Sequence, residues 1–174
     1  HDFARDEHHN GYVHFRRPFD GAPLPDAPLP EGFSVRAVGG EDEWQRRVDL
    51  HRVVYHPSRV TLKAYRRLRA APIYRPDLDL VAVAPDGAFV SYCILWYDER
   101  NRIGEYEPVG AHPDWRRQRI TRAVLVEGLR RLRALGAERA IVLTASDNTP
   151  AIHLYESVGF ILHAHERYYR ARAQ

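Results

Sequence analysis

Residues 113–125, PDWRRQRITRAVL, lead from a predicted strand into the helix that the sequence predicts most strongly. The start of this helix is crowded with cations: Arg116, Arg117, Arg119 and Arg122. The N-terminal end of a helix carries partial positive charge, so each exposed cation there costs about 0.3–1 kcal/mol. Backbone N–H groups at a helix start also bind anions, and arginines would add charge-assisted hydrogen bonds. We therefore expect an anion site here; the alternative is that the arginines simply face water.

The residues that follow supply a helix, a strand and a second helix. Apolar residues recur with helical spacing over residues 120–135, and Gly136 suits the position just after the helix end. Residues 139–144, RAIVLT, form a continuous apolar run that is typical of a buried parallel strand. Residues 149–158 predict a short helix with Pro150 in its first turn.

The preceding part of the chain predicts an antiparallel meander with two helices near its start. We expect strands at 33–38, 78–84, 88–97 and 103–111, helices at 41–55 and 58–71, and a final strand pair at 161–165 and 167–172. A meander that runs into a right-handed β-α-β crossover predicts a mixed α/β sheet. Helices should cover both faces of this sheet.

The N-terminal region differs in composition from the rest. Residues 20–32, DGAPLPDAPLPEG, carry four prolines at nearly alternate positions and predict a semi-rigid, extended connection. We therefore assign residues 1–32 to an extended arm or linker and residues 33–174 to the folded domain. The chain contains no Met, not even at position 1, which suggests a start at a cleavage point or inside a longer polypeptide.

Composition excludes several classes of protein. The chain has 174 residues and 44% hydrophobic residues, which suits one folded domain. No run approaches the roughly 18 apolar residues of a membrane helix, so no membrane partner is expected. Cys93 is the only cysteine, which favours a reducing cytoplasm and argues against a cysteine-based metal cluster. The net charge of +3 permits an anionic ligand without requiring nucleic acid.

Three segments between residues 105 and 160 carry a family pattern. EPVGAHPDWRR (107–117) matches a strand that ends in V-x-P before an acidic-aromatic-Arg step, and RRQRITRAVL (116–125) aligns with R-x-x-G-x-G/A. DNTPAIHLYESVGF (147–160) matches N-x-x-A-x-x-x-Y-x-x-x-G-F. In these segments the chain resembles the GNAT superfamily of acyl-CoA-dependent N-acyltransferases, especially mycothiol-synthase-like and other tandem-domain members. The resemblance implies a mostly antiparallel sheet that splays at its fourth central strand.

The resemblance also implies a coenzyme site for acetyl-CoA, with no metal. The strand end would donate to the thioester oxygen, the arginine-rich loop would cradle the pyrophosphate, and the last motif would contact the pantetheine: Val109, Gly110, Ala111, Arg116, Arg117, Gln118, Arg119, Ile120, Thr121, Asn148 and Ala151. The chain departs from the family at Arg119 and Thr121, where small residues, usually glycines, are the rule. The Arg119 side chain could fill the cradle, or it could turn outward and add a cationic contact.

Tyr155 and two glutamates are the catalytic candidates. Tyr155 matches the tyrosine that acts in the family as general acid toward the CoA sulfur; the alternative is a plain core residue. Glu105 and Glu107 share one face of their strand, because side chains alternate along it, and either could deprotonate an acceptor amine. They could also bind a cationic substrate or face solvent. Pro108 between them and the strand end predicts a bulge or an unpaired edge.

The resemblance implies transfer of an acetyl group from acetyl-CoA to a primary amine, by direct attack through a tetrahedral intermediate. The acceptor would be a small-molecule amine or a peptide N-terminus. A homodimer or a second GNAT domain is a further expected partner. The alternative is a degenerate, non-catalytic GNAT domain with a structural or ligand-sensing role. A nucleic-acid binder that uses the arginine-rich helix is a weaker hypothesis, since the interleaved aromatic residues are missing.

Overall fold

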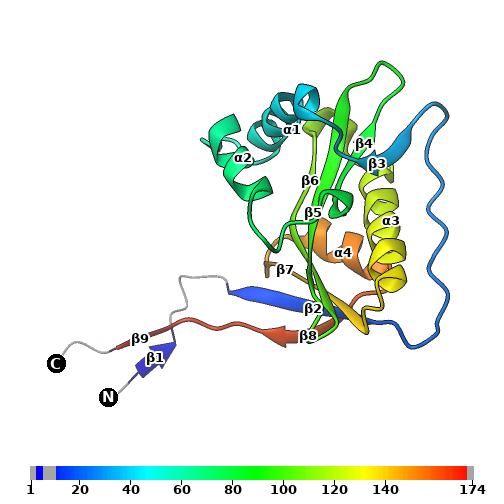
Figure 1. The fold of residues 1–174 in the computed structure, drawn as a ribbon. Coiled ribbons are helices and arrows are strands. Elements are labelled where there is room, and N and C mark those ends of the chain that lie inside the picture. Colours follow the sequence, from blue (N-terminus) through cyan, green and yellow to red (C-terminus); the bar gives the residue numbers. More distant parts are fainter. Residues whose placement is uncertain (1–2, 6–10, 172–174) are drawn as a thin grey trace.

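A seven-stranded sheet is the centre of the computed structural model, which describes residues 3–5 and 11–171. Its strands are, in spatial order, β3 (Ser34–Ala37), β4 (Asp79–Val83), β5 (Phe89–Asp98), β6 (Ile103–Ala111), β7 (Arg139–Ala145), β2 (Tyr12–Pro18) and β8 (Ile161–His165). Only the β6–β7 pair of this sheet is parallel. The short strands β1 (Phe3–Arg5) and β9 (Tyr169–Ala171) pair with each other, away from the main sheet (Figure 1).

Helices cover both faces of the sheet, as the sequence predicts. They are α1 (Glu41–Val54), α2 (Leu62–Arg69), α3 (Ile120–Ala134) and α4 (Thr149–Ser157). Adjacent residues of β5 show the two faces, because Tyr92 packs with Leu50 of α1 whereas Cys93 belongs to the larger cluster with Leu125 of α3. Figure 1 shows α1 and α2 on one side of the sheet and α3 and α4 on the other. This arrangement confirms the predicted fold class.

The sheet opens between β6 and β7. These strands pair only from Ile103↔Arg139 to Glu105↔Ile141; beyond this point β6 continues along β5 while β7 continues along β2. The register of β5 against β6 also shifts, so that Glu107 and Pro108 together lie opposite Ile94. The splay at the fourth central strand and the bulge at Pro108 are therefore both confirmed.

Two predictions about the chain ends were wrong. Residues 12–18 do not belong to an arm: they form β2, which lies inside the sheet between β7 and β8. Val13 and Phe15 point into the core, so the sheet begins well before residue 33. The expected final strand pair also does not form, because β8 pairs with β2 and β9 pairs with β1.

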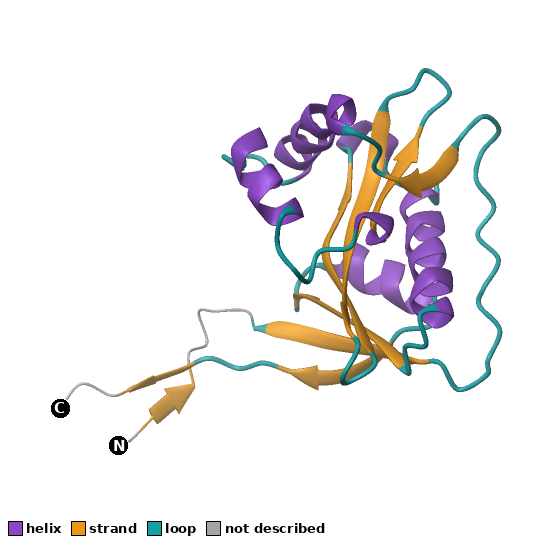
Figure 2. Ribbon diagram, in the orientation of Figure 1, coloured by secondary structure: helices purple, strands orange, loops and turns teal. Residues whose placement is uncertain are grey.

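Residues 19–33, which we call the connecting segment, join β2 to β3. They form neither helix nor strand and run past α3 along the outside of the molecule (Figure 2). This extended course agrees with the proline content. The segment is nevertheless packed, since Leu24, Ala27 and Leu29 rest on the larger core cluster.

A buried ion pair fixes α1 and α2 to the sheet. Arg47 Nε of α1 lies 3.1 Å from Asp79 Oδ1 of β4, and both side chains are almost fully buried. The hydroxyls of Tyr65 and Tyr74 donate to the other oxygen, Asp79 Oδ2, at 2.7 and 3.0 Å. Because both oxygens of the buried carboxylate are hydrogen-bonded, these contacts fix α1 and α2 against β4.

Candidate functional site

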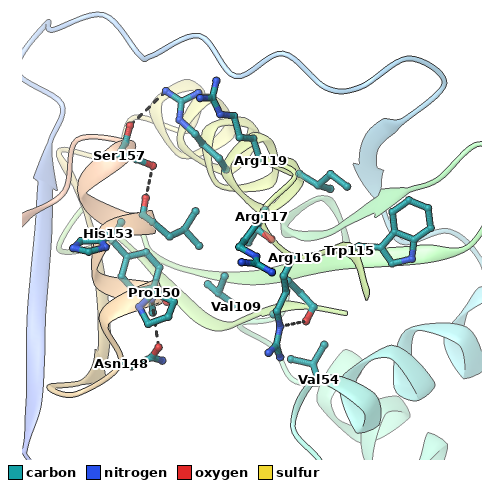
Figure 3. Close-up of a pocket in the computed structure, with 18 of the residues that line it drawn as sticks. Val54, Val109, Trp115, Arg116, Arg117, Arg119, Asn148, Pro150, His153 and Ser157 are labelled. Carbon is teal, nitrogen blue, oxygen red and sulfur yellow. Dashed lines mark hydrogen bonds between the residues drawn. The ribbon is translucent and has the colours of Figure 1, made fainter. Parts of the chain in front are cut away.

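The opening of the sheet leads into a cavity of about 990 Å³ between α3 and α4 (Figure 3). Most residues predicted to bind the coenzyme line it: Val109, Gly110, Ala111, Arg116, Arg117, Arg119, Ile120, Thr121, Asn148 and Ala151. Tyr155 lines it as well. Gln118, Glu105 and Glu107 do not line it. The cavity therefore brings together segments from the strand end, the arginine-rich loop and the last motif.

The start of α3 opens onto this cavity without a cap. Arg119 occupies the N-cap position and its side chain makes no capping hydrogen bond. The first helical hydrogen bond runs from Ala123 N to Arg119 O, so the amides of Ile120, Thr121 and Arg122 have no partner inside the helix. Free N–H groups beside cationic side chains are what an anion site requires.

Arg117 and Arg119 hold a backbone conformation that glycine adopts most readily. Their φ angles are 63° and 61°. A left-handed conformation costs a residue other than glycine about 1–2 kcal/mol. At residue 119 the chain thus keeps the glycine-like turn of the family motif although the residue is arginine. The Arg119 side chain is exposed at the rim, toward Ser157 in Figure 3, so it does not plug the cavity.

The other arginines of this loop are partly engaged. Arg122 Nη1 donates to the carbonyl of Asp26, and Arg122 Nη2 donates to Ser157 O at 3.4 Å. Arg116 Nε lies 3.5 Å from Ala111 O. Within the described chain, Arg117 and Arg119 form no hydrogen bond or ion pair, so their guanidinium groups are free for an anion.

The hydroxyl of Thr121 is tied to the sheet. Ser91 Oγ lies 3.0 Å from Thr121 Oγ1 and 2.9 Å from Gly110 O. This contact fixes the first turn of α3 against β5, beside the strand end. Thr121 therefore offers its backbone amide, rather than its hydroxyl, to the cavity.

Tyr55, just after α1, holds the end of β6. Its hydroxyl donates to Val109 O at 2.7 Å. Desolvation of the hydroxyl, together with the nearby charge of Glu107, raises the pKa of Tyr55 to about 12. The hydroxyl therefore stays protonated at neutral pH and fixes the strand end that borders the cavity.

Helix α4 supplies the opposite wall. Asn148 caps it, since Asn148 Oδ1 accepts from Ala151 N at 3.3 Å, and Asn148 Nδ2 donates to Thr144 Oγ1 at 3.1 Å. Tyr155 is buried, and burial, followed by the proximity of Tyr55 and Glu107, raises the pKa of its phenol. Among the described residues the Tyr155 hydroxyl has no hydrogen-bond partner, which leaves it free to donate into the cavity.

Of the two glutamates, Glu107 is the one whose charge acts on tyrosines that line the cavity. Glu105 is in the last β6–β7 pair, whereas Glu107 lies beyond the split, in the bulge. Desolvation, with a smaller contribution from Glu105, raises the pKa of the Glu107 carboxyl. The charge of Glu107 in turn raises the pKa values of Tyr55 and Tyr155, which line the cavity. Trp96 Nε1 donates to Glu107 O at 2.7 Å and fixes the bulge.

A split parallel strand pair beside an uncapped, arginine-rich helix start agrees with the family comparison. The model of the acetyltransferase (GNAT) family matches residues 43–160. The chain belongs to this family. It is 31% identical over 160 residues to the mycothiol acetyltransferase of Streptomyces coelicolor, covering 89% of this chain and 51% of that protein.

Solved GNAT structures show the same fold. A GCN5-related N-acetyltransferase from Sphaerobacter thermophilus superposes with a TM-score of 0.77 at 21% identity, covering 91% of this chain and 49% of that one. A tandem GNAT protein from the clavulanic acid biosynthesis pathway superposes with a TM-score of 0.75 at 15% identity, covering 96% of this chain and 54% of that one. This GNAT chain thus spans about half the length of these relatives.

Several residues of the GNAT cavity were not assigned to the coenzyme site from the sequence. Pro150, His153, Leu154 and Ser157 lie at helical spacing on the α4 face that carries Ala151 and Tyr155, so this spacing could have identified them. Asp26 and Pro28 come from the connecting segment, and no motif marks them.

In the described part of the chain, no group of three or more His, Cys, Asp or Glu side chains could hold a metal ion. Within residues 3–5 and 11–171, no helix is long and apolar enough to cross a membrane.

Proposed function

We propose that this chain is an N-acetyltransferase domain that transfers an acetyl group from acetyl-CoA to a primary amine. The observation that carries the proposal is one cavity that joins the split strand end, the uncapped start of α3 and the hydroxyl-bearing side chain of Tyr155. A cavity of about 990 Å³ is at the upper end of the usual range for ligand sites and suits an elongated coenzyme.

The residues present fit a coenzyme with an anionic end and an uncharged end. The free amides of α3 and the unpaired Arg117 and Arg119 would hold the pyrophosphate, where Asp and Glu side chains are scarce. The strand end at Val109–Ala111 offers backbone groups to the pantetheine and to the thioester oxygen. Asn148 and Ala151 border the cavity between these two ends.

Glu107 is the proposed base and Tyr155 the proposed donor to sulfur. In the reaction the amine nitrogen bonds to the thioester carbon, the C–S bond breaks, and one proton passes overall from nitrogen to sulfur. Glu107, with its raised pKa, accepts the amine proton directly or through water. Tyr155 has a raised pKa and therefore stays protonated, so its hydroxyl stabilises the departing thiolate by a hydrogen bond.

The proposed acceptor is an amine that reaches Glu107. Either a small-molecule amine or a peptide N-terminus would meet Glu107. The relative in Streptomyces coelicolor is a mycothiol acetyltransferase, which favours small-molecule amines as the class to test first. A second GNAT domain or a second copy of the chain is a further proposed partner, because the relatives are about twice as long.

A degenerate domain that binds coenzyme without catalysis is the second candidate. Arg119 and Arg117 favour it, because two left-handed residues other than glycine lie in the loop that a coenzyme would contact. This domain would bind acetyl-CoA but would release no thiol with any amine.

A thiol-release assay separates the two candidates. The purified chain is incubated with acetyl-CoA and a panel of amines, grouped into amino acids, amino sugars, polyamines and peptides, and free CoA is detected with a thiol reagent. The transferase proposal predicts amine-dependent CoA release for at least one class, with an acetylated amine detected by mass spectrometry. Binding of acetyl-CoA without release across the full panel would instead support the degenerate domain.

A further inference from the structure

The connecting segment forms part of the cavity as well as a link between strands. Asp26 and Pro28 line the cavity, whereas Leu24, Ala27 and Leu29 pack inward on the core. The chain is extended here, so alternate residues can face the core and the cavity. Four prolines limit the backbone to extended conformations, which suits a fixed wall.

Side chains of α3, of β2 and of the loop before α3 hold the segment in place. Arg122 of α3 donates to the carbonyl of Asp26, and the same guanidinium donates to Ser157 O at the end of α4. Arg17 Nη2 of β2 donates to Pro23 O at 3.3 Å. At the far end of the segment, Phe33 packs edge-to-face on Trp115, with 5.4 Å between ring centroids. Arg122 therefore joins α3, α4 and the segment at one point.

The segment borders the arginine-rich end of the cavity. Figure 3 shows Val54 at one end of the cavity and Arg119 and Ser157 at the other, and the ribbon of the segment passes beyond Arg119. The carboxylate of Asp26 is exposed and makes no ion pair within the described chain. A negative charge thus lies at the end of the cavity where the cations gather.

We propose that the connecting segment is a fixed wall of the coenzyme site at its phosphate end. We further propose that the Asp26 carboxylate weakens phosphate binding there. This inference rests on the proposed function, since it assumes a coenzyme in this cavity. It assigns Arg122 a positioning role, because its guanidinium holds the wall, and it makes Asp26 a determinant of affinity. It also gives the arginines at the start of α3 separate roles, because Arg122 holds the wall while Arg117 and Arg119 remain unpaired for the ligand.

Hydrogen exchange measured by mass spectrometry tests the wall on the full chain. The probes are acetyl-CoA, 3′,5′-adenosine diphosphate as its nucleotide end, and S-acetylpantetheine as its uncharged end. We expect exchange of the non-proline amides of residues 20–32 to slow at least about threefold with the first two probes, and to remain unchanged with the third. The amides of residues 120–123 report coenzyme binding independently.

The three possible results separate the two proposals. Protection of both 120–123 and 20–32 supports the wall. Protection of 120–123 alone overturns the wall and leaves the proposed function standing. Protection of neither region at saturating acetyl-CoA overturns the proposed function, and the wall with it.

Asp26→Asn tests the charge effect, with Glu31→Gln as the matched control in the same segment. Glu31 does not line the cavity. Removal of one screened charge should tighten acetyl-CoA binding about threefold in 50 mM salt, and the gain should vanish in 0.5 M salt. S-acetylpantetheine should bind the variant and the wild type alike. Equal Kd values for acetyl-CoA in Asp26→Asn, Glu31→Gln and wild type would contradict the role of Asp26.

Discussion

At the scale of single residues, Tyr155 allows a clean test because its ring and its hydroxyl have separate roles. The ring packs against Phe15 and Phe160, with centroids 6.1 Å away in each case. Tyr155 lines the cavity, and its hydroxyl has no hydrogen-bond partner in the described chain. Tyr155→Phe keeps the packing and removes the donor. We expect kcat to fall about 100-fold while KM for acetyl-CoA changes less than about threefold, measured by thiol release.

A core role for Tyr155 makes the opposite prediction. Phenylalanine would then be neutral, and kcat would match the wild type. Thermal denaturation of Tyr155→Phe serves as the control, since a Tm within about 2 °C of the wild type excludes unfolding as the cause of a lost activity.

Glu107 sets the predicted pH dependence. Desolvation and the nearby Glu105 raise its pKa, so the carboxylate needed as a base forms only above the ordinary range for a glutamate. We expect kcat/KM to rise with pH through this raised pKa, and Glu107→Gln to lose that limb together with about 100-fold of the activity. The measurement is kcat/KM from pH 4 to 9 for both proteins. An unchanged profile in Glu107→Gln would rule this residue out as the base and leave Glu105 to be tested.

The raised pKa of Glu107 also determines how this residue changes the stability of the fold with pH. A carboxyl whose pKa is raised by folding binds its proton more tightly in the folded state, so this group favours the folded state at low pH. That contribution is lost as pH rises through the folded-state pKa, and at neutral pH the partly desolvated carboxylate beside Glu105 destabilises the folded state. Glu107→Gln removes this cost, so its Tm at pH 7 should equal or exceed that of the wild type. Loss of activity in this variant therefore reports chemistry.

At the scale of elements, the start of α3 combines strain with function. Arg119 holds φ at 61°, where glycine is favoured. We predict that Arg119→Gly raises stability by about 0.5–1 kcal/mol, or about 1–4 °C in Tm, in coenzyme-free protein. The matched control is Arg130→Gly in the middle of the same helix, where glycine should lower stability by about 1 kcal/mol. A lower Tm for Arg119→Gly would contradict the strain assigned to this residue.

The elements that the sequence predicts well are those with a local signal. Helix α3 shows helical apolar spacing and ends just before Gly136, and strand β6 contains Pro108 at its bulge. These signals lie within a short stretch of sequence. The bounds of both elements were therefore predicted within one residue. Strand β2 has no such signal. Its core-facing positions include Arg17, which interrupts the alternation begun by Val13 and Phe15. Its partners, β7 and β8, lie more than 100 residues away along the chain, so local pattern does not reveal the pairing.

Some residues of the candidate site also have a local sequence signal, whereas others do not. The strand end, the loop and the last motif follow from sequence, because each lies in a continuous stretch with family spacing. Asp26 and Pro28 enter the cavity through tertiary packing of a proline-rich segment, which composition alone describes as a linker. The left-handed conformation of Arg117 likewise appears only in the folded loop.

At the scale of the whole molecule, the position of β2 predicts where the domain can be cut. A chain of residues 33–174 would lose the strand between β7 and β8, leaving β8 without its partner. Val13 and Phe15 are buried, and loss of each removes about 1.5–3 kcal/mol of stabilising free energy from the burial of its side chain. The total stability of a typical domain is only about 5–15 kcal/mol. We expect residues 11–174 to melt cooperatively by circular dichroism and residues 33–174 to show no cooperative transition. A folded 33–174 chain with a similar Tm would contradict the assignment of β2 to the core.

The central claim is that one cavity, opened by the split of β6 from β7, holds the coenzyme of acetyl transfer. Calorimetric titration of the chain with acetyl-CoA tests it most directly, in low salt and again in 0.5 M salt. We expect one site per chain with a Kd in the micromolar range, and weaker binding at high salt, because arginines and helix amides hold the phosphates. Absence of binding heat, confirmed by unchanged hydrogen exchange at millimolar acetyl-CoA, would contradict it.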